Sequence, residues 1–120
     1  MPSFSVMIVE DEPLIAMMME ALVEDVGGAT RGPYTNVPAA MGALERGEAV
    51  DVALLDCNLG RGEHSWPVAD ALAARGIPFA FTSGQGAKEM VERFVDRPVF
   101  AKPVDEEGLR RFLRQHIPHA

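Results

Sequence analysis

Short apolar runs alternate along the chain with longer stretches in which apolar residues recur at helical spacing. The runs that we interpret as strands cover residues 5–9, 29–32, 50–55, 77–82 and 99–101. Continuous apolar runs of this length are typical of strands that are buried on both faces, as in a parallel sheet. Their alternation with helical stretches predicts a series of β-α-β units.

Five helices are expected after these strands. The first begins at Pro13, because proline suits the first turn of a helix, and it ends before the pair Gly27-Gly28. The predicted N-caps of the second, third and fifth helices are Asn36, Ser65 and Asp105. A short fourth helix is predicted to carry Val91, Phe94 and Val95. Inward positions are also predicted for the other four helices. They are Leu14, Met17, Met18, Ala21 and Leu22 in the first helix and Ala40, Met41 and Leu44 in the second. They are Val68, Ala69, Leu72 and Ala73 in the third helix and Leu109, Phe112 and Leu113 in the fifth.

Right-handed connections between parallel strands place helices on both faces of the sheet. We therefore predict an α/β fold with three layers, a doubly wound five-stranded parallel sheet of the flavodoxin-like strand order 2-1-3-4-5. A chain of 120 residues has room for one ordinary domain, so residues 1–120 are expected to form a single domain.

The charge balance narrows the kinds of partner. The chain carries 18 Asp and Glu residues against 11 Lys and Arg residues, a net charge of −7. Phosphate backbones and anionic lipid surfaces repel such a chain, so neither nucleic acid nor a membrane is an expected partner. No apolar run approaches the roughly 20 residues of a membrane span, and the start of the chain lacks the pattern of a signal peptide. We therefore expect a cytoplasmic protein, and its single cysteine, Cys57, fits a reducing compartment.

Chemically active side chains follow four of the predicted strands. The acidic residues 10–12 follow the first strand, Asp56 follows the third and Lys102 follows the fifth. In doubly wound sheets, ligands bind beyond the carboxyl ends of the strands where the strand order reverses, here between the first and third strands. Thr82 and Ser83 both offer a hydroxyl to this edge of the sheet. Because neighbouring strand residues point to opposite faces, only one of them can face the site, and Ser83 is preferred as the last residue before a glycine.

Crowded carboxylates repel one another unless a cation lies among them. Mg²⁺ fits best, because it prefers an octahedron of oxygen ligands and is commonly held by one or two carboxylates together with water and phosphate oxygens. The expected direct side-chain ligands are Asp11 and Asp56. Glu10 has a longer side chain and is expected to act through a bound water. The backbone carbonyl of Asn58 is expected to reach the ion from the loop after the third strand.

A carboxylate whose charge is partly neutralised by a metal ion can attack phosphorus and form an acyl phosphate. Asp56 is the expected nucleophile, because it follows the buried run of residues 52–55 and so has a rigid support. Lys102 is expected to bring a positive charge to the phosphoryl oxygens, and Ser83 is expected to donate a hydrogen bond to one of them.

Four sequence elements resemble the receiver domain of two-component response regulators, in the same order and over nearly the whole chain: VMIVEDEP, ALLDCNLG, IPFAFTSGQG and FAKPV. The resemblance implies that Glu10 and Asp11 are the acidic pair of the family and that Asp56 is its phosphoacceptor. It likewise implies that Ser83 is the switch Thr or Ser and that Lys102 is the invariant lysine. A cis Lys102–Pro103 peptide is a further expectation from the family.

The stretch DALAARGIPFAFTSGQG, followed by RPVFAKP, is similar to alphaproteobacterial single-domain receivers that pair with histidine kinases of the HWE type. This similarity implies a sensor histidine kinase as the phosphoryl donor. It also implies that no output domain is present, so that a downstream protein partner or a phosphotransfer protein takes the signal. The chain departs from the common family pattern at Glu10, Ser83, Gln85 and Val99, where receivers more often carry Asp, Thr, an aromatic residue, and Tyr or Phe.

The expected function is therefore that of a stand-alone receiver that is phosphorylated and changes its surface without turning over a metabolite. One alternative is a small phosphohydrolase of the haloacid dehalogenase type, but that family carries a D-x-D motif on its first strand, whereas Asp56 follows the third. A pseudo-receiver scaffold is the other alternative, and it is disfavoured by the intact Asp11, Asp56 and Lys102. Cys57 is interpreted as packing, His64 as a loop residue, and two of the three methionines at 17–19 as core filling.

Overall fold

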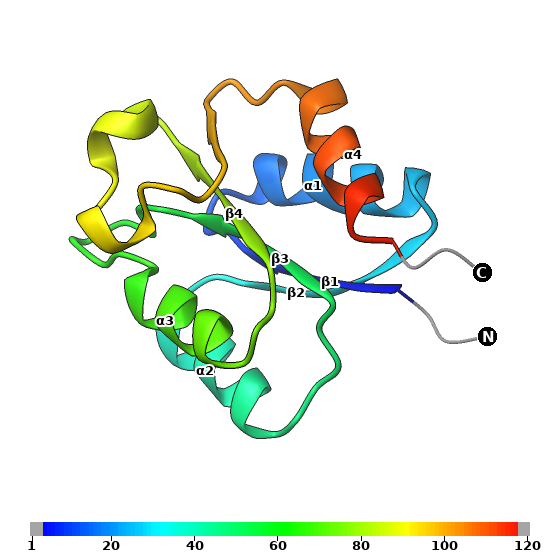
Figure 1. The fold of residues 1–120 in the computed structure, drawn as a ribbon, viewed down its shortest axis with the longest axis horizontal. Helices are drawn as coiled ribbons and strands as arrows, with labels where there is room; N and C mark the ends of the chain where they lie inside the picture. Colours follow the sequence, from blue (N-terminus) through cyan, green and yellow to red (C-terminus); the bar gives the residue numbers. More distant parts are fainter. Residues whose placement is uncertain (1–3, 118–120) are drawn as a thin grey trace.

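A computed structural model describes residues 4–117 (Figure 1), so residues 1–3 and 118–120 of the expected domain lie outside the described part. The five strands of this part form one parallel sheet in the order β2-β1-β3-β4-β5. Their bounds are β1 (Phe4–Val9), β2 (Gly28–Tyr34), β3 (Val52–Asp56), β4 (Phe79–Ser83) and β5 (Val99–Ala101). The predicted α/β fold and its strand order are confirmed.

Four α-helices of the described chain cover the two faces of this sheet. Helices α1 (Pro13–Asp25) and α4 (Glu106–Gln115) lie on one face, and α2 (Val37–Glu45) and α3 (Trp66–Ala74) lie on the other, which gives three layers (Figure 1). All of β3 is buried, and its side chains alternate between two cores: Ala53 and Leu55 pack with α2 and α3, while Leu54 packs with α1 and α4. The central strand is therefore buried on both faces, as its apolar run predicted.

Helix α1 has the predicted start, but its predicted core stripe is only partly correct: Leu22 is buried and Met18 packs against the core, whereas three other residues are exposed. Leu14 is 80% exposed, Met17 is 63% exposed and Ala21 is exposed as well. The buried residues are Ala16, Met19, Leu22 and Val23. This helix is apolar nearly all the way round, so apolar spacing alone leaves its rotation open. Its acidic residues, Glu20 and Glu24, fall three and seven positions after Met17 and mark the same outer face.

The three predicted N-caps behave differently. The Asn36 side chain accepts a hydrogen bond from the backbone N–H of Ala39 at 2.8 Å, so this cap is confirmed. Ser65 and Asp105 occupy the N-cap positions of α3 and α4, but within residues 4–117 neither side chain accepts a capping hydrogen bond. Ser65 has φ −83° and ψ 10°, which is not the extended backbone that points a cap side chain at the helix N–H groups. On α3, the predicted inward Ala73 is exposed.

The predicted fourth helix is replaced by two 3₁₀ segments, η1 (Gly86–Glu89) and η2 (Glu92–Phe94). Val91 between them is extended, with φ −82° and ψ 155°, and this interrupts any continuous helix. Phe94 is buried as predicted, whereas Val95 is 61% exposed. A helix this short is marginal by itself, so tertiary contacts decide the backbone. Here the deciding contact is the packing of the Phe94 ring near the rings of Trp66, Phe79 and Phe81.

Within residues 4–117, none of the helices combines the length and the apolar character that a membrane crossing needs.

Candidate functional site

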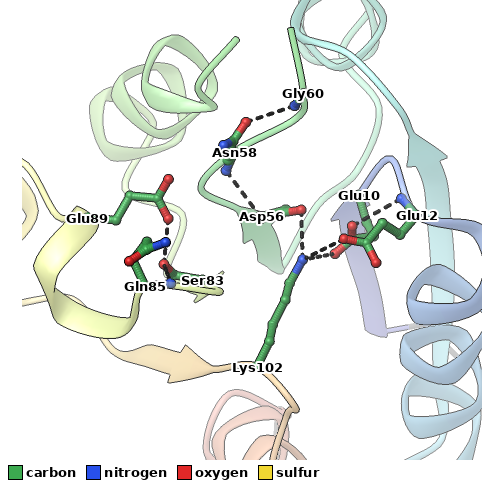
Figure 2. A network of polar contacts seen from close by, with 9 residues as sticks. All are labelled: Glu10, Glu12, Asp56, Asn58, Gly60, Ser83, Gln85, Glu89 and Lys102. Carbon is green, nitrogen blue, oxygen red and sulfur yellow. Dashed lines mark hydrogen bonds and ion pairs between the residues drawn. The ribbon is translucent and has the colours of Figure 1, made fainter. Parts of the chain in front are cut away.

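The carboxyl ends of the strands bring the predicted acidic and basic residues together. Asp56 is the last residue of β3, Glu10 and Asp11 follow β1, and Lys102 follows β5. The ammonium Nζ of Lys102 donates to Asp56 Oδ2 at 3.0 Å (Figure 2). The Lys102–Pro103 peptide is cis, as predicted. The structure thus joins side chains from three strand ends at the edge where the strand order reverses.

Lys102 is the positive centre of this group. Its Nζ also lies 3.6 Å from Glu10 Oε1 and 3.5 Å from Glu12 Oε1. Partial burial on its own lowers the pKa of Lys102, but the hydrogen bond to Asp56 and the charges of Asp56, Glu10 and Glu12 outweigh it and raise the pKa. The side chain therefore stays an ammonium, and it offers a fixed positive charge beside the Asp56 carboxylate.

Glu10 is buried almost completely, with 1% of its surface exposed. Its Oε2 accepts a hydrogen bond from the backbone N–H of Glu12 at 3.1 Å, but its Oε1 has no hydrogen-bond partner in the described part of the chain. Burial, followed by the hydrogen bonding and charge of Asp56, raises the pKa of Glu10 from 4.5 to about 8. The Lys102 ammonium lies 3.6 Å from this oxygen, beyond hydrogen-bond distance, so the oxygen still lacks a donor and favours a bound water or cation.

Four carboxylates form one cluster at this edge. Glu10, Asp11, Glu12 and Asp56 each offer an oxygen, and these oxygens lie within 4.8 Å of one another. Three of them, all but Glu10, border a cavity of about 290 Å³ lined by Asp11, Glu12, Asp56, Asn58, Gly60, Gly84, Gln85, Glu89 and Lys102. The cluster has the oxygen donors that a hard divalent cation prefers, and the unpartnered Glu10 Oε1 fits the same ion. Glu12, one of the three acidic residues that follow β1, occupies the N-cap of α1 and also belongs to this cluster.

The loop after β3 closes over the same cavity. The backbone N–H of Asn58 donates to Asp56 Oδ1 at 3.2 Å, and the Asn58 side chain accepts from the backbone N–H of Gly60 at 2.8 Å. Gly60 has φ +85°, and a Cβ at this position would lie 3.3 Å from Asp11 Oδ2. A side chain here would therefore crowd Asp11, and glycine allows the loop to approach the acidic cluster.

The two candidate hydroxyls of β4 are both buried, and neither residue lines the cavity. Thr82 Oγ1 has no hydrogen-bond partner among residues 4–117. Ser83 Oγ donates to Glu89 Oε1 at 2.5 Å and accepts from the backbone N–H of Gln85 at 3.1 Å (Figure 2). Sequence reasoning missed Glu89, because its contact with Ser83 depends on the course of the backbone after β4, which no residue spacing predicts.

The structure agrees with the interpretation of Cys57 as a packing residue and of His64 as a loop residue. Cys57 is buried, and burial, followed by the charges of Glu89 and Asp56, raises the pKa of its thiol to about 12. A thiol with so high a pKa is a poor nucleophile, in agreement with a packing role. The His64 ring stacks on Trp66 with 5.4 Å between centroids, and its Nε2 lies 3.9 Å from Glu89 Oε2.

Comparisons with known proteins identify the family. No family model and no curated protein matches the chain. Among solved structures, the solution structure of SdrG from Sphingomonas melonis Fr1 is 45% identical, with 93% of this chain and 94% of that chain covered and a TM-score of 0.82. The beryllofluoride-activated conformation of SdrG from Pseudomonas melonis Fr1 is 44% identical over 95% and 97% of the two chains, with a TM-score of 0.77.

A third similar structure names the family directly. The response regulator REC domain of PhyR from Erythrobacter litoralis is 26% identical over 98% of this chain and 96% of that chain, with a TM-score of 0.80. The doubly wound fold with an acidic site at its switch point defines the class as an α/β protein that binds its ligand at the carboxyl edge of a parallel sheet. Within that class, this chain belongs to the receiver-domain family of response regulators.

Proposed function

We propose that this receiver accepts a phosphoryl group from a sensor histidine kinase onto Asp56, in a reaction that depends on Mg²⁺. The observation that carries the proposal is the contact between Asp56 Oδ2 and Lys102 Nζ at 3.0 Å, beside a cavity lined by further carboxylates. The similarity to SdrG, whose structure is described in a beryllofluoride-activated conformation, supports the same chemistry.

The acidic cluster fits a magnesium ion, because Glu10 Oε1 is buried without a hydrogen-bond partner in residues 4–117 and the neighbouring oxygens are carboxylates. Asp11 and Asp56 would hold the ion directly, together with the backbone carbonyl of Asn58, and Glu10 would act through a water. When bound, Mg²⁺ neutralises the charge of the cluster and polarises the phosphoryl oxygens.

Asp56 is the nucleophile in this proposal. One of its carboxylate oxygens forms a bond to phosphorus while the bond from phosphorus to the imidazole nitrogen of the donor breaks, and that nitrogen keeps the electron pair. Lys102 stays charged beside the reacting centre and stabilises the negative phosphoryl oxygens. Ser83 donates a hydrogen bond to one of these oxygens once its hydroxyl is free of Glu89.

The partners follow from the family and the charge. The donor is a sensor histidine kinase, and the sequence elements shared with receivers of HWE-type kinases favour that type. The net charge of −7 disfavours nucleic acid and anionic membranes as targets, so the signal passes to a protein partner or to a phosphotransfer protein. A receiver domain that acts in the cytoplasm belongs to the same proposal.

The test is phosphorylation by acetyl phosphate in the presence of Mg²⁺, followed by intact mass spectrometry. The wild-type chain should gain one base-labile phosphoryl group, Asp56→Asn should gain none, and the control Asp96→Asn, at an exposed position, should behave as wild type. Labelling that survives Asp56→Asn, or that maps to His64, would overturn the assignment. Hydrolysis of p-nitrophenyl phosphate with turnover would instead indicate a phosphohydrolase.

A further inference from the structure

We propose that Glu89 is a positioning residue that holds the Ser83 hydroxyl in the resting receiver and has to release it before that hydroxyl can bind the phosphoryl group. The inference rests on the proposed function, because it concerns the way in which the phosphorylated state forms. It assigns a role to a carboxylate that the reaction at Asp56 does not itself use.

The single hydroxyl hydrogen of Ser83 is already used in a hydrogen bond. A serine hydroxyl has one O–H to donate, and an ionised carboxylate can only accept. Ser83 Oγ donates to Glu89 Oε1 at 2.5 Å, and the backbone N–H of Gln85 donates to the same Oγ at 3.1 Å. The hydroxyl therefore has both a donor and an acceptor in the resting state. A phosphoryl oxygen on Asp56 also needs the single proton of Ser83, so it competes with Glu89.

The position of Glu89 makes this competition direct. Its side chain is 12% exposed, and the residue lines the same cavity as Asp56 and Lys102. Acylation of Asp56 brings a group of about two negative charges into this cavity. Because the Glu89 side chain is itself largely buried, its charge is only partly screened, so the phosphoryl group repels Glu89 while it attracts the Ser83 hydroxyl. Both effects favour the same rearrangement.

The backbone around Glu89 permits the release. Gly84 and Gly86 lie between Ser83 and Glu89, and Gly86 has φ +61°. Beyond Glu89 the chain is anchored by the buried ring of Phe94. At the surface, Arg93 adds a bidentate ion pair to Asp70 of α3 at 2.9 and 3.0 Å. The rearrangement is therefore confined to residues 84–90.

His64 offers the displaced carboxylate a new partner. Its Nε2 already lies 3.9 Å from Glu89 Oε2, and its side chain is 41% exposed. A shift of Glu89 towards His64 breaks the bond to Ser83 without moving the carboxylate into an apolar environment. The same shift alters the surroundings of Trp66, the one tryptophan of the chain, on which the His64 ring is stacked.

The experiment measures beryllofluoride binding to the Mg²⁺-loaded full chain by ¹⁹F NMR, in wild type, Glu89→Gln, Glu89→Ala and the control Glu92→Gln, which changes an exposed acid of η2. Glu89→Ala should tighten binding about tenfold, since it removes a charge-assisted hydrogen bond that competes with the ligand. Glu89→Gln keeps an oxygen acceptor without the charge, so it should tighten binding less. Glu92→Gln should bind as wild type does.

The same variants in a Ser83→Ala background separate positioning from a general effect of charge. If Glu89 acts through Ser83, most of the gain from Glu89→Ala disappears when the hydroxyl is absent. The ¹⁹F resonance of the fluorine that accepts from Ser83 should also change its chemical shift in this background, while thermal unfolding checks that each variant is folded. An equal gain in both backgrounds, or no gain from Glu89→Ala, overturns the role of Glu89. Absence of beryllofluoride binding by the wild-type chain overturns the proposed function as well.

Discussion

Lys102 Nζ and Asp56 Oδ2 lie 3.0 Å apart although the two residues are 46 positions apart in the sequence. The side chains are 17% and 4% exposed, respectively. A pair so well shielded interacts more strongly than a surface ion pair, and removing one partner leaves the other charge buried. The same pair prepares the site for phosphorylation, because the ammonium stands next to the carboxylate that would carry the phosphoryl group.

Replacing Lys102 by Ala should separate catalysis from metal binding. The rate of phosphorylation by acetyl phosphate should fall by about 10²–10³-fold, the usual effect of removing one group that stabilises developing charge. Mg²⁺ affinity should be retained or rise, because a cation next to the acidic cluster is lost. Rates from mass spectrometry and affinities from calorimetry would check this, with the exposed Lys88→Ala as control. Weaker Mg²⁺ binding in Lys102→Ala would contradict the proposed arrangement.

Asp11 and Glu12 should differ as magnesium ligands. Asp11 faces the cavity close to the loop at Gly60, whereas the Glu12 side chain is 58% exposed and has Lys102 Nζ 3.5 Å away. Asp11→Ala should therefore weaken Mg²⁺ binding by at least about tenfold more than Glu12→Ala does. Isothermal titration with Mg²⁺ measures both, and a chelator should stop phosphorylation of the wild-type chain. Equal losses in the two variants would mean that the ligand set is different.

The strands and the acidic edge were predictable because they depend on local patterns. The buried run of β3 fixes Asp56 at a strand end, and the parallel order then brings Glu10, Asp11 and Lys102 to the same edge. No partner from far along the chain has to be known for this step. The resemblance of the sequence to receiver domains rests on the same strand-end residues.

The parts that were wrong depend on tertiary contacts. The rotation of α1 was misjudged because Leu14 and Met17 are as apolar as the buried Met19, so only packing against the sheet distinguishes them. A short helix carrying Val91, Phe94 and Val95 was expected, but the burial of Phe94 and the extended Val91 give two 3₁₀ segments instead. This difference also hid the contact between Ser83 and Glu89, which depends on the backbone between them.

Stability without a divalent cation should depend on pH through Glu10. Its pKa is 4.5 for the ordinary group and about 8 in the folded protein. Between these values the folded state holds a proton that the unfolded chain lacks, so the free energy of unfolding falls as the pH rises. Glu10→Gln removes this loss. The free energy of unfolding of the variant, relative to that of wild type, should therefore rise by more than about 1 kcal/mol between about pH 5 and about pH 9. Urea unfolding in the presence of a chelator measures it, and a constant difference between the two proteins would refute the burial argument.

Activation should change amide exchange over a short segment of the surface. Beryllofluoride bound at Asp56 should draw the Ser83 hydroxyl inward and release Glu89, so the amides of residues 83–90 should change their exchange rates. The change should stop before Arg93 and Phe94, because the ion pair to Asp70 and the aromatic cluster hold them. Helix α4 should change less, since residue 99 is a valine with little surface to bury or expose.

Exchange measured by mass spectrometry, with and without beryllofluoride, distinguishes this pattern from others. Arg93→Ala removes the ion pair to Asp70 and should let the change spread beyond residue 90, while Arg97→Ala, whose guanidinium lies 4.3 Å from the Phe79 ring centroid outside the moving segment, should leave the limit where it is. Unchanged exchange at residues 83–90, with protection only at Asp11 and Asp56, would show that phosphorylation acts on another surface. A change that already extends through η2 in the wild-type chain would show that Arg93 and Phe94 do not anchor the segment.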